Sequence, residues 1–160
     1  LLDGPPVRGR LLNRTVLRRA FAVLGPTEAA WSMLAFLVSF AVLGWRPGES
    51  FPTGPAALAA SGAAFVAVVL AQAANAFACR SSTRWPGALG WTTNRLLIPA
   101  VAVGVAVAMT TVFVPGIASV LGQASPPPAG WAVAVAGMGV ILAVDATDKA
   151  VRRRLVARRR

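Results

Sequence analysis

The sequence predicts an all-α, polytopic membrane protein with four transmembrane helices and both termini in the cytoplasm. Of its 160 residues, 56% are hydrophobic and 13% are charged, whereas about a quarter of the residues in a soluble domain are charged. The hydrophobic residues form four runs long enough to cross a bilayer. Segments rich in lysine and arginine alternate with nearly neutral loops, which is the pattern of the positive-inside rule.

The first elements are a basic cytoplasmic lead-in at 1–19 and a transmembrane span at 20–45. From Leu11 the lead-in is either an amphipathic helix on the membrane surface or a solvated charged loop. In the span, Pro26 removes a backbone donor and is expected to kink the helix. Glu28 follows inside the apolar run, where an ionisable side chain is by default a functional hypothesis. The alternative is a protonated or hydrogen-bonded structural group.

The second span, at 56–79, is rich in alanine and glycine, which let membrane helices approach closely. It ends with two amides and a thiol at helical spacing, so that Gln72, Asn75 and Cys79 point the same way. A side-chain amide inside a membrane needs a partner, so this face is predicted to look inward toward other helices. Cys79 has no second cysteine to pair with and is expected to be a small, buried, apolar residue.

The remaining spans are predicted at 96–114 and 131–151, followed by a basic cytoplasmic tail at 152–160. The last turns of the fourth span carry Asp145 and Lys149, four residues apart with the acid first, which is the favoured order for an ion pair along a helix. These two residues and Glu28 are the expected intramembrane polar residues.

The orientation follows from counting lysines and arginines in each connecting segment. The N-terminal segment holds five, the connector between the second and third spans holds three, and the C-terminal end holds seven including Lys149. The loop after the first span has only Arg46, and the loop after the third has none. Both termini and the middle connector are therefore predicted to be cytoplasmic.

The composition also excludes several classes of function. The chain has no histidine and no tyrosine, which argues against histidine acid–base chemistry, most zinc sites and haem ligation. It has no nucleotide-binding motif, and no catalytic or cofactor-binding residue is predicted. A net charge of +11 would suggest nucleic acid in a soluble protein, but these arginines flank apolar runs, so no nucleic-acid partner is expected.

Short motifs in a fixed order carry a family resemblance. They are Pro5-Pro6 with Arg8 nearby, Leu11-Leu12-Asn13-Arg14, Leu24-Gly25-Pro26-Thr27-Glu28-Ala29, the set Gln72, Asn75, Phe77, Cys79, Arg80 and Ser81, then Asn94-Arg95-Leu96-Leu97, Val114-Pro115, Trp131, and Asp145 with Lys149. Together they resemble the C-terminal membrane module of P-type cation-transporting ATPases of the calcium/sodium–potassium branch, meaning the seventh to tenth transmembrane helices.

The resemblance implies that the chain is the support domain of an ATP-driven cation pump, and its start at Leu1 suggests a fragment. The domain would brace the ion-site helices. Its partners would be the lipid bilayer, the preceding transmembrane helices and the cytosolic domains of the pump. ATP and Mg²⁺ would act on those other domains. In calcium pumps the eighth helix adds one acidic ligand at the position of Gln72, where an amide keeps the oxygen and loses the charge. Asn75 is the second candidate ion ligand.

One departure from the family pattern lies in the fourth span, where the usual glutamate three residues before the lysine is Ala146. The resemblance implies that Asp145, four residues before Lys149, takes its place.

Two other functions remain open from the sequence. One is a free-standing, four-helix, proton-coupled transporter that uses Glu28, although the long basic lead-in and the lack of tyrosine argue against it. The other is a membrane assembly or scaffold protein. The abundance of alanine, valine, glycine and arginine suggests a bacterial plasma membrane.

Overall fold

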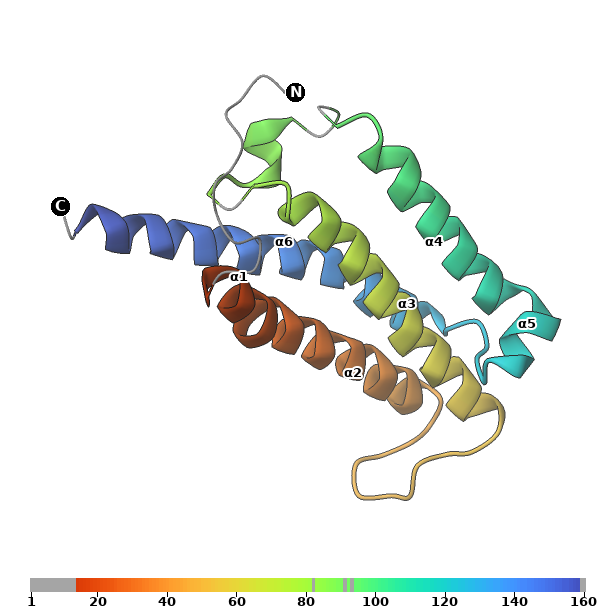
Figure 1. Cartoon of the computed structure of the whole chain (residues 1–160). Coiled ribbons are helices and arrows are strands. Elements are labelled where there is room, and N and C mark those ends of the chain that lie inside the picture. The colour runs from red at the N-terminus through yellow and green to blue at the C-terminus, as the bar shows by residue number, and fades with distance from the viewer. Residues whose placement is uncertain (1–13, 82, 91, 93, 159–160) are drawn as a thin grey trace.

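The computed structural model describes residues 14–81, 83–90, 92 and 94–158 (Figure 1). Within these ranges all regular secondary structure is helical, and loops connect the helices. The expected lead-in before residue 14 lies outside the described residues. The elements are α1 (Arg14–Arg19), the π-helical segment η1 (Ala20–Leu24), α2 (Gly25–Val42), α3 (Pro55–Ala78), the short 3₁₀ helix η2 (Pro86–Leu89), α4 (Leu97–Phe113), α5 (Pro115–Val120) and α6 (Pro128–Ala157).

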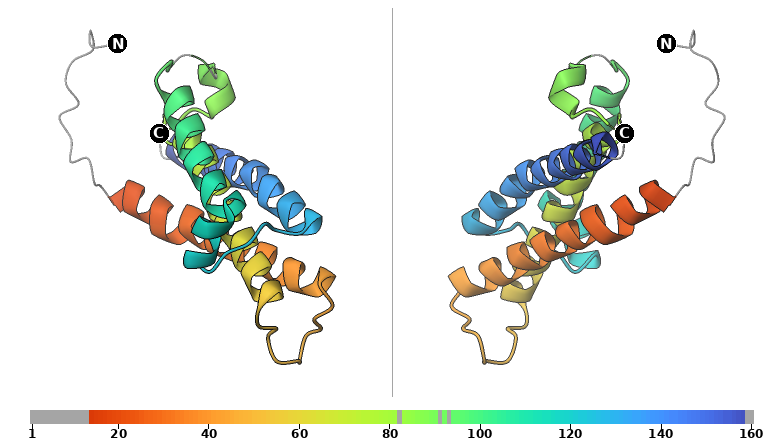
Figure 2. Two further views of the ribbon diagram at one scale, coloured as in Figure 1. Left: turned by 90° about the vertical axis from the view of Figure 1, so that its right-hand side faces the viewer. Right: turned by 90° about the vertical axis from the view of Figure 1, so that its left-hand side faces the viewer.

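The first three elements form one continuous helical rod, seen from two sides in Figure 2. The sequence predicts a kink at Pro26, and the structure places a π-helical segment directly before it, in which the Gly25 N–H donates to Ala20 O. A proline ring crowds the carbonyl group one turn earlier, and a wider π turn is one way a helix relieves such crowding. The hydroxyl of Thr27 donates to Val23 O at 2.7 Å.

Helix α3 is the centre of the bundle, because it packs against α2, α6 and α4. Its inward face is a stripe of small residues at spacings of three and four, which places them on one side of a helix. All of them are buried: Ala60, Ala63, Ala67, Ala71, Ala74 and Ala78. The absence of larger side chains along this stripe lets α2 and α6 approach the α3 backbone closely.

Glycines mark the closest approaches between elements. A Cβ atom on Gly62 would lie 1.9 Å from Ala124 O, and one on Gly137 would lie 2.5 Å from the Trp31 ring. That ring is fixed, because Trp31 Nε1 donates to Val133 O at 2.7 Å. The predicted role of small residues in helix packing is therefore visible at individual contacts.

Three helical segments are long and apolar enough to cross a membrane: Val16–Val42, Pro55–Ala78 and Pro128–Leu155. Helix α4 is also apolar but has 17 residues. The surface carries many exposed hydrophobic side chains, among them Phe21, Val103 and Val107, as is expected of helices that face lipid. The chain is an integral membrane protein. Its last helix, α6, is the longest and extends beyond the other helices at its C-terminal end (Figure 1).

Candidate functional site

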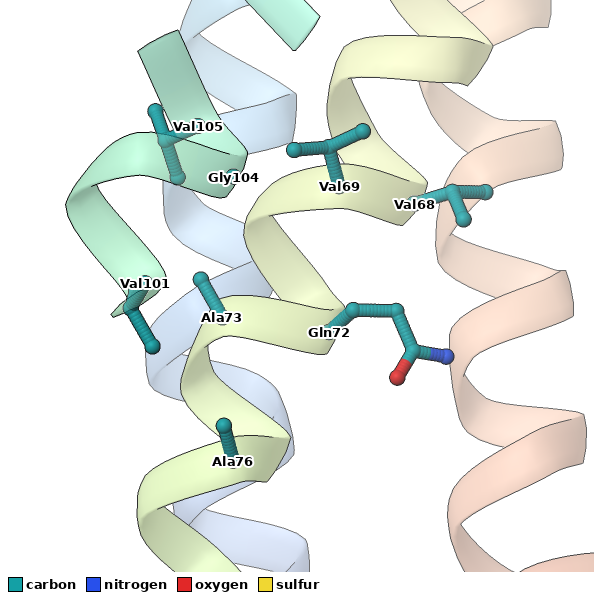
Figure 3. A pocket seen from close by; sticks show the side chains of 8 residues that line it. All are labelled: Val68, Val69, Gln72, Ala73, Ala76, Val101, Gly104 and Val105. Carbon is teal, nitrogen blue, oxygen red and sulfur yellow. The ribbon is translucent and has the colours of Figure 1, made fainter. Parts of the chain in front are cut away.

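Glu28 on α2 and Gln72 on α3 lie opposite each other across the α2–α3 interface. Gln72 Nε2 donates to both carboxylate oxygens of Glu28, at 2.8 and 3.0 Å. Figure 3 shows the Gln72 side chain leaving α3 toward α2, with α6 behind α3 and α4. Glu28 is half-buried and Gln72 is exposed. Within the described part of the chain, no hydrogen bond involves Gln72 Oε1.

A pocket of about 230 Å³ lies beside this pair, and Gln72, Asn75 and Cys79 all line it together with Glu28 and Arg19. The three α3 side chains therefore share one face, as their spacing predicts, and the Cys79 thiol lies 3.4 Å from Asn75 Oδ1. We call Glu28, Gln72 and Asn75 the polar face.

One expectation is wrong, because Cys79 is exposed rather than buried. Gln72 is also exposed, although its amide has the partner on a neighbouring helix that its place in the membrane requires, namely Glu28. The reason is the alanine stripe of α3, which occupies the side that packs on α2 and α6. Gln72 follows Ala71 by one residue, and one residue turns a helix by about 100°, so the amides lie beside that interface rather than in it.

A second, apolar groove of about 280 Å³ lies between α3 and α4 (Figure 3). Valine, alanine and glycine line it, and Gln72 stands at its edge. Its side chains offer no chemistry beyond apolar contact. Gln72 is therefore the residue shared by the groove and the polar pocket.

Asp145 on α6 lies at the centre of a buried charge cluster. Its Oδ2 accepts from Lys149 Nζ at 2.6 Å, and its Oδ1 pairs with Arg19 Nη2. The side chains of Asp145 and Lys149 are 0% and 1% exposed, and that of Arg19 is 12% exposed. The i,i+4 pair expected along this helix is therefore present, and it has a further partner from α1.

Lys149 also closes the C-terminal end of α3. Its Nζ donates to Ala78 O at 2.8 Å and to Arg84 O at 3.2 Å. The last carbonyl groups of a helix have no partner within it, and a cation at this end also complements the helix dipole. Lys149 thus joins α6 both to α3 and to the connector that leads to α4.

A second carboxylate extends the cluster toward its exposed rim. Asp148 lies 2.8 Å from Arg18 Nη2 and 2.8 Å from Arg152 Nε. The sequence does not predict the two ion pairs between α1 and α6, which are Arg18 with Asp148 and Arg19 with Asp145. The available signal is that two adjacent arginines, Arg18 and Arg19, can face two acids that are three residues apart on one side of another helix. We call these six residues the charge cluster: Arg18, Arg19, Asp145, Asp148, Lys149 and Arg152.

The two regions offer different chemistry. In the charge cluster, the carboxylates are each paired with two cations. The polar face has one carboxylate and two amides, which provide oxygen ligands of the kind that hard cations bind. Among the described residues, no group of three or more His, Cys, Asp or Glu side chains could hold a metal ion. Ca²⁺ takes about six to eight oxygens, so the polar face is at most part of such a site.

Comparison with protein families gives one match, described as "Cation transporting ATPase, C-terminus", over residues 1–151. A comparison with curated proteins finds no match. The family match includes every residue of the polar face and the centre of the charge cluster at Asp145. The chain belongs to the cation-transporting ATPase C-terminus family, the C-terminal membrane domain of P-type cation ATPases.

Proposed function

We propose that the chain braces the ion-carrying helices of an ATP-driven cation pump and that Gln72 and Asn75 lend oxygens to the transported cation. In this proposal the chain crosses the membrane four times, with α4 as the third span and both termini in the cytoplasm. ATP and Mg²⁺ act on cytosolic domains of the pump, in a bacterial plasma membrane, and the branch is the one that includes calcium and sodium–potassium pumps.

The observation that carries the proposal is the bond from the Gln72 amide nitrogen to Glu28. This bond occupies the nitrogen and leaves the amide oxygen available to a cation. Glu28 then acts as a positioning residue, because it fixes which end of the amide points outward. Asn75 adds a second amide oxygen one turn further along α3, on the wall of the same pocket.

The exposure of the polar face supports the bracing role. A carboxylate facing lipid carries a large free-energy cost, and Glu28 is the only charged residue of α2. Other transmembrane helices must therefore cover this side of α2 and α3. In a cation pump those are the preceding helices, which would supply the remaining oxygens. An amide at position 72 lowers the negative charge of the site by one relative to a carboxylate.

The test is the cation dependence of ATP hydrolysis by the polypeptide that carries this chain, assayed in membranes with Ca²⁺, Na⁺ and K⁺ in turn. Gln72→Ala should raise the half-activating concentration of the transported cation by roughly tenfold, because one oxygen ligand is lost. The matched control is Ser32→Ala, one turn from Glu28, whose hydroxyl donates only to Ala29 O at 3.0 Å. An unchanged half-activating concentration for Gln72→Ala would remove the ligand role and leave the bracing role standing.

A further inference from the structure

The C-terminal turns of α6 carry more positively charged side chains than the nearby carboxylates can neutralise. Within the described residues at this end, the acids are Asp145 and Asp148, and the charge cluster occupies both. The exposed arginines at this end that form no ion pair in the described part of the chain include Arg14, Arg153, Arg154 and Arg158. Arg153 and Arg154 lie on the last two turns of α6, and Arg158 directly follows its last residue, Ala157.

The length of α6 determines where these arginines lie relative to the bilayer. The helix has 30 residues, which is about 45 Å at 1.5 Å per residue, whereas the hydrocarbon core is about 30 Å thick. Its apolar part ends at Asp145, and Arg153 and Arg158 lie about 12 and 20 Å beyond that residue along the axis. The headgroup region extends about 5–8 Å beyond the hydrocarbon core on each side, so Arg153 lies near its outer edge and Arg158 lies beyond it.

Exposed apolar residues lie among these arginines. Val151 is 49% exposed and Leu155 is 55% exposed. An isolated polar helix in water gains nothing from exposed valine and leucine, whereas both side chains can be shielded from water against a bilayer surface. The alternation of arginine with apolar residues therefore favours a lipid surface over an acidic protein in solution.

We infer that Arg153, Arg154 and Arg158 form a binding surface for anionic phospholipid headgroups of the leaflet that surrounds this end of the bundle. The headgroup phosphates supply the negative charge that the protein lacks beyond the charge cluster. Arg14 on α1 extends the surface toward the first helix. The inference depends on the membrane location of the chain and not on its proposed ion ligands, so either can fail without the other.

The test uses the protein in phosphatidylcholine vesicles that contain a trace of spin-labelled phosphatidylglycerol or spin-labelled phosphatidylcholine. Electron paramagnetic resonance gives the fraction of each lipid held at the protein. We expect about a fivefold preference for phosphatidylglycerol, the contribution of one arginine near an anionic surface, and a decline of that preference with added salt.

The combined variant Arg153→Gln, Arg154→Gln and Arg158→Gln should lower the preference to near one. Replacing the same three arginines with lysine should retain it, because the charge remains. The control Arg46→Gln, on the loop at the other end of α2, should leave it unchanged. Equal retention of both lipids by the unaltered protein, or an unchanged preference in the glutamine variant, would overturn the inference. So would loss of the preference in millimolar inorganic phosphate but not in chloride of equal ionic strength, since free phosphate would then be the ligand.

Discussion

The charge cluster joins α1, α6 and the end of α3, and the polar face lies between α2 and α3. The two regions differ in how many partners each ionisable side chain has within this chain. In the charge cluster, Asp145 has no exposed surface and pairs with two cations, and Lys149 has three oxygen partners. In the polar face, Glu28 has one described partner residue, and Gln72 is exposed. Both regions contain polar groups expected inside a membrane, but only in the first is each carboxylate paired with two cations of this chain.

The difference separates groups that hold the domain together from groups that are available to something else. A buried ion pair that loses one partner leaves an uncompensated charge, and that is strongly destabilising. A half-buried polar group beside a pocket loses less when its partner is removed, because the other side chains of this chain do not enclose it. Stability and ion affinity should therefore respond to different residues.

The strongest test of this difference removes one carboxylate from each region and compares the two losses of stability. Asp145→Ala should lower the free energy of unfolding by about 3–5 kcal/mol, because Arg19 and Lys149 would remain buried without it. Glu28→Gln should change the free energy of unfolding by less than about 0.5 kcal/mol. Denaturant unfolding of both variants in mixed micelles measures this difference. Similar losses in the two variants would show that the polar face is as structural as the charge cluster.

A smaller loss of stability is expected when Lys149, which caps the C-terminal end of α3, is replaced. Lys149→Met should lower the free energy of unfolding by about 2–3 kcal/mol, because Ala78 O, Arg84 O and Asp145 lose a charged donor, while Arg19 still pairs with Asp145. Hydrogen exchange should accelerate at the amides of Cys79 and Arg80, whose N–H groups bond within the last turn of α3. Arg153→Met is the control, since Arg153 is an exposed cation on the same helix. Protection of these amides that stays unchanged in Lys149→Met would mean that the cap is not needed to hold the helix end.

The smallest expected effect concerns helix packing at a site without charged residues, where α6 meets Trp31 of α2. Gly137→Ala should lower the free energy of unfolding by about 1–3 kcal/mol, because the new methyl group meets the fixed Trp31 ring. Gly139→Ala, two residues along the same helix, meets nothing within 4 Å and should be nearly neutral. Thermal unfolding of the pair measures the difference, and equal melting temperatures would indicate that the indole moves aside.

Much of the fold can be predicted from the sequence because its signals are local. The apolar runs predict helices, the i,i+4 spacing predicts the contact between Asp145 and Lys149, and helical periodicity places Gln72 and Asn75 on one face. These are properties of neighbouring residues along one helix.

The parts that sequence reasoning missed depend on how the helices pack. Arg19 and Asp145 are 126 residues apart, and neither has a neighbour that specifies the other. Gln72 finds its partner on α2 but stays exposed, because the alanine stripe occupies the side of α3 that packs on α2 and α6. For the same reason Cys79, which follows the buried Ala78, is exposed.

The position of Lys149 has a consequence for biosynthesis. Chains leave the ribosome from the N-terminus, so Arg19 and the end of α3 are made long before the residues that satisfy them. Until α6 is inserted, the carbonyl of Ala78 and the guanidinium of Arg19 lack their partners on that helix. A translation product that ends before Asp145 would therefore leave these groups without their partners on α6. Among the described helices, α6 therefore supplies partners to α1, which is synthesised well before it.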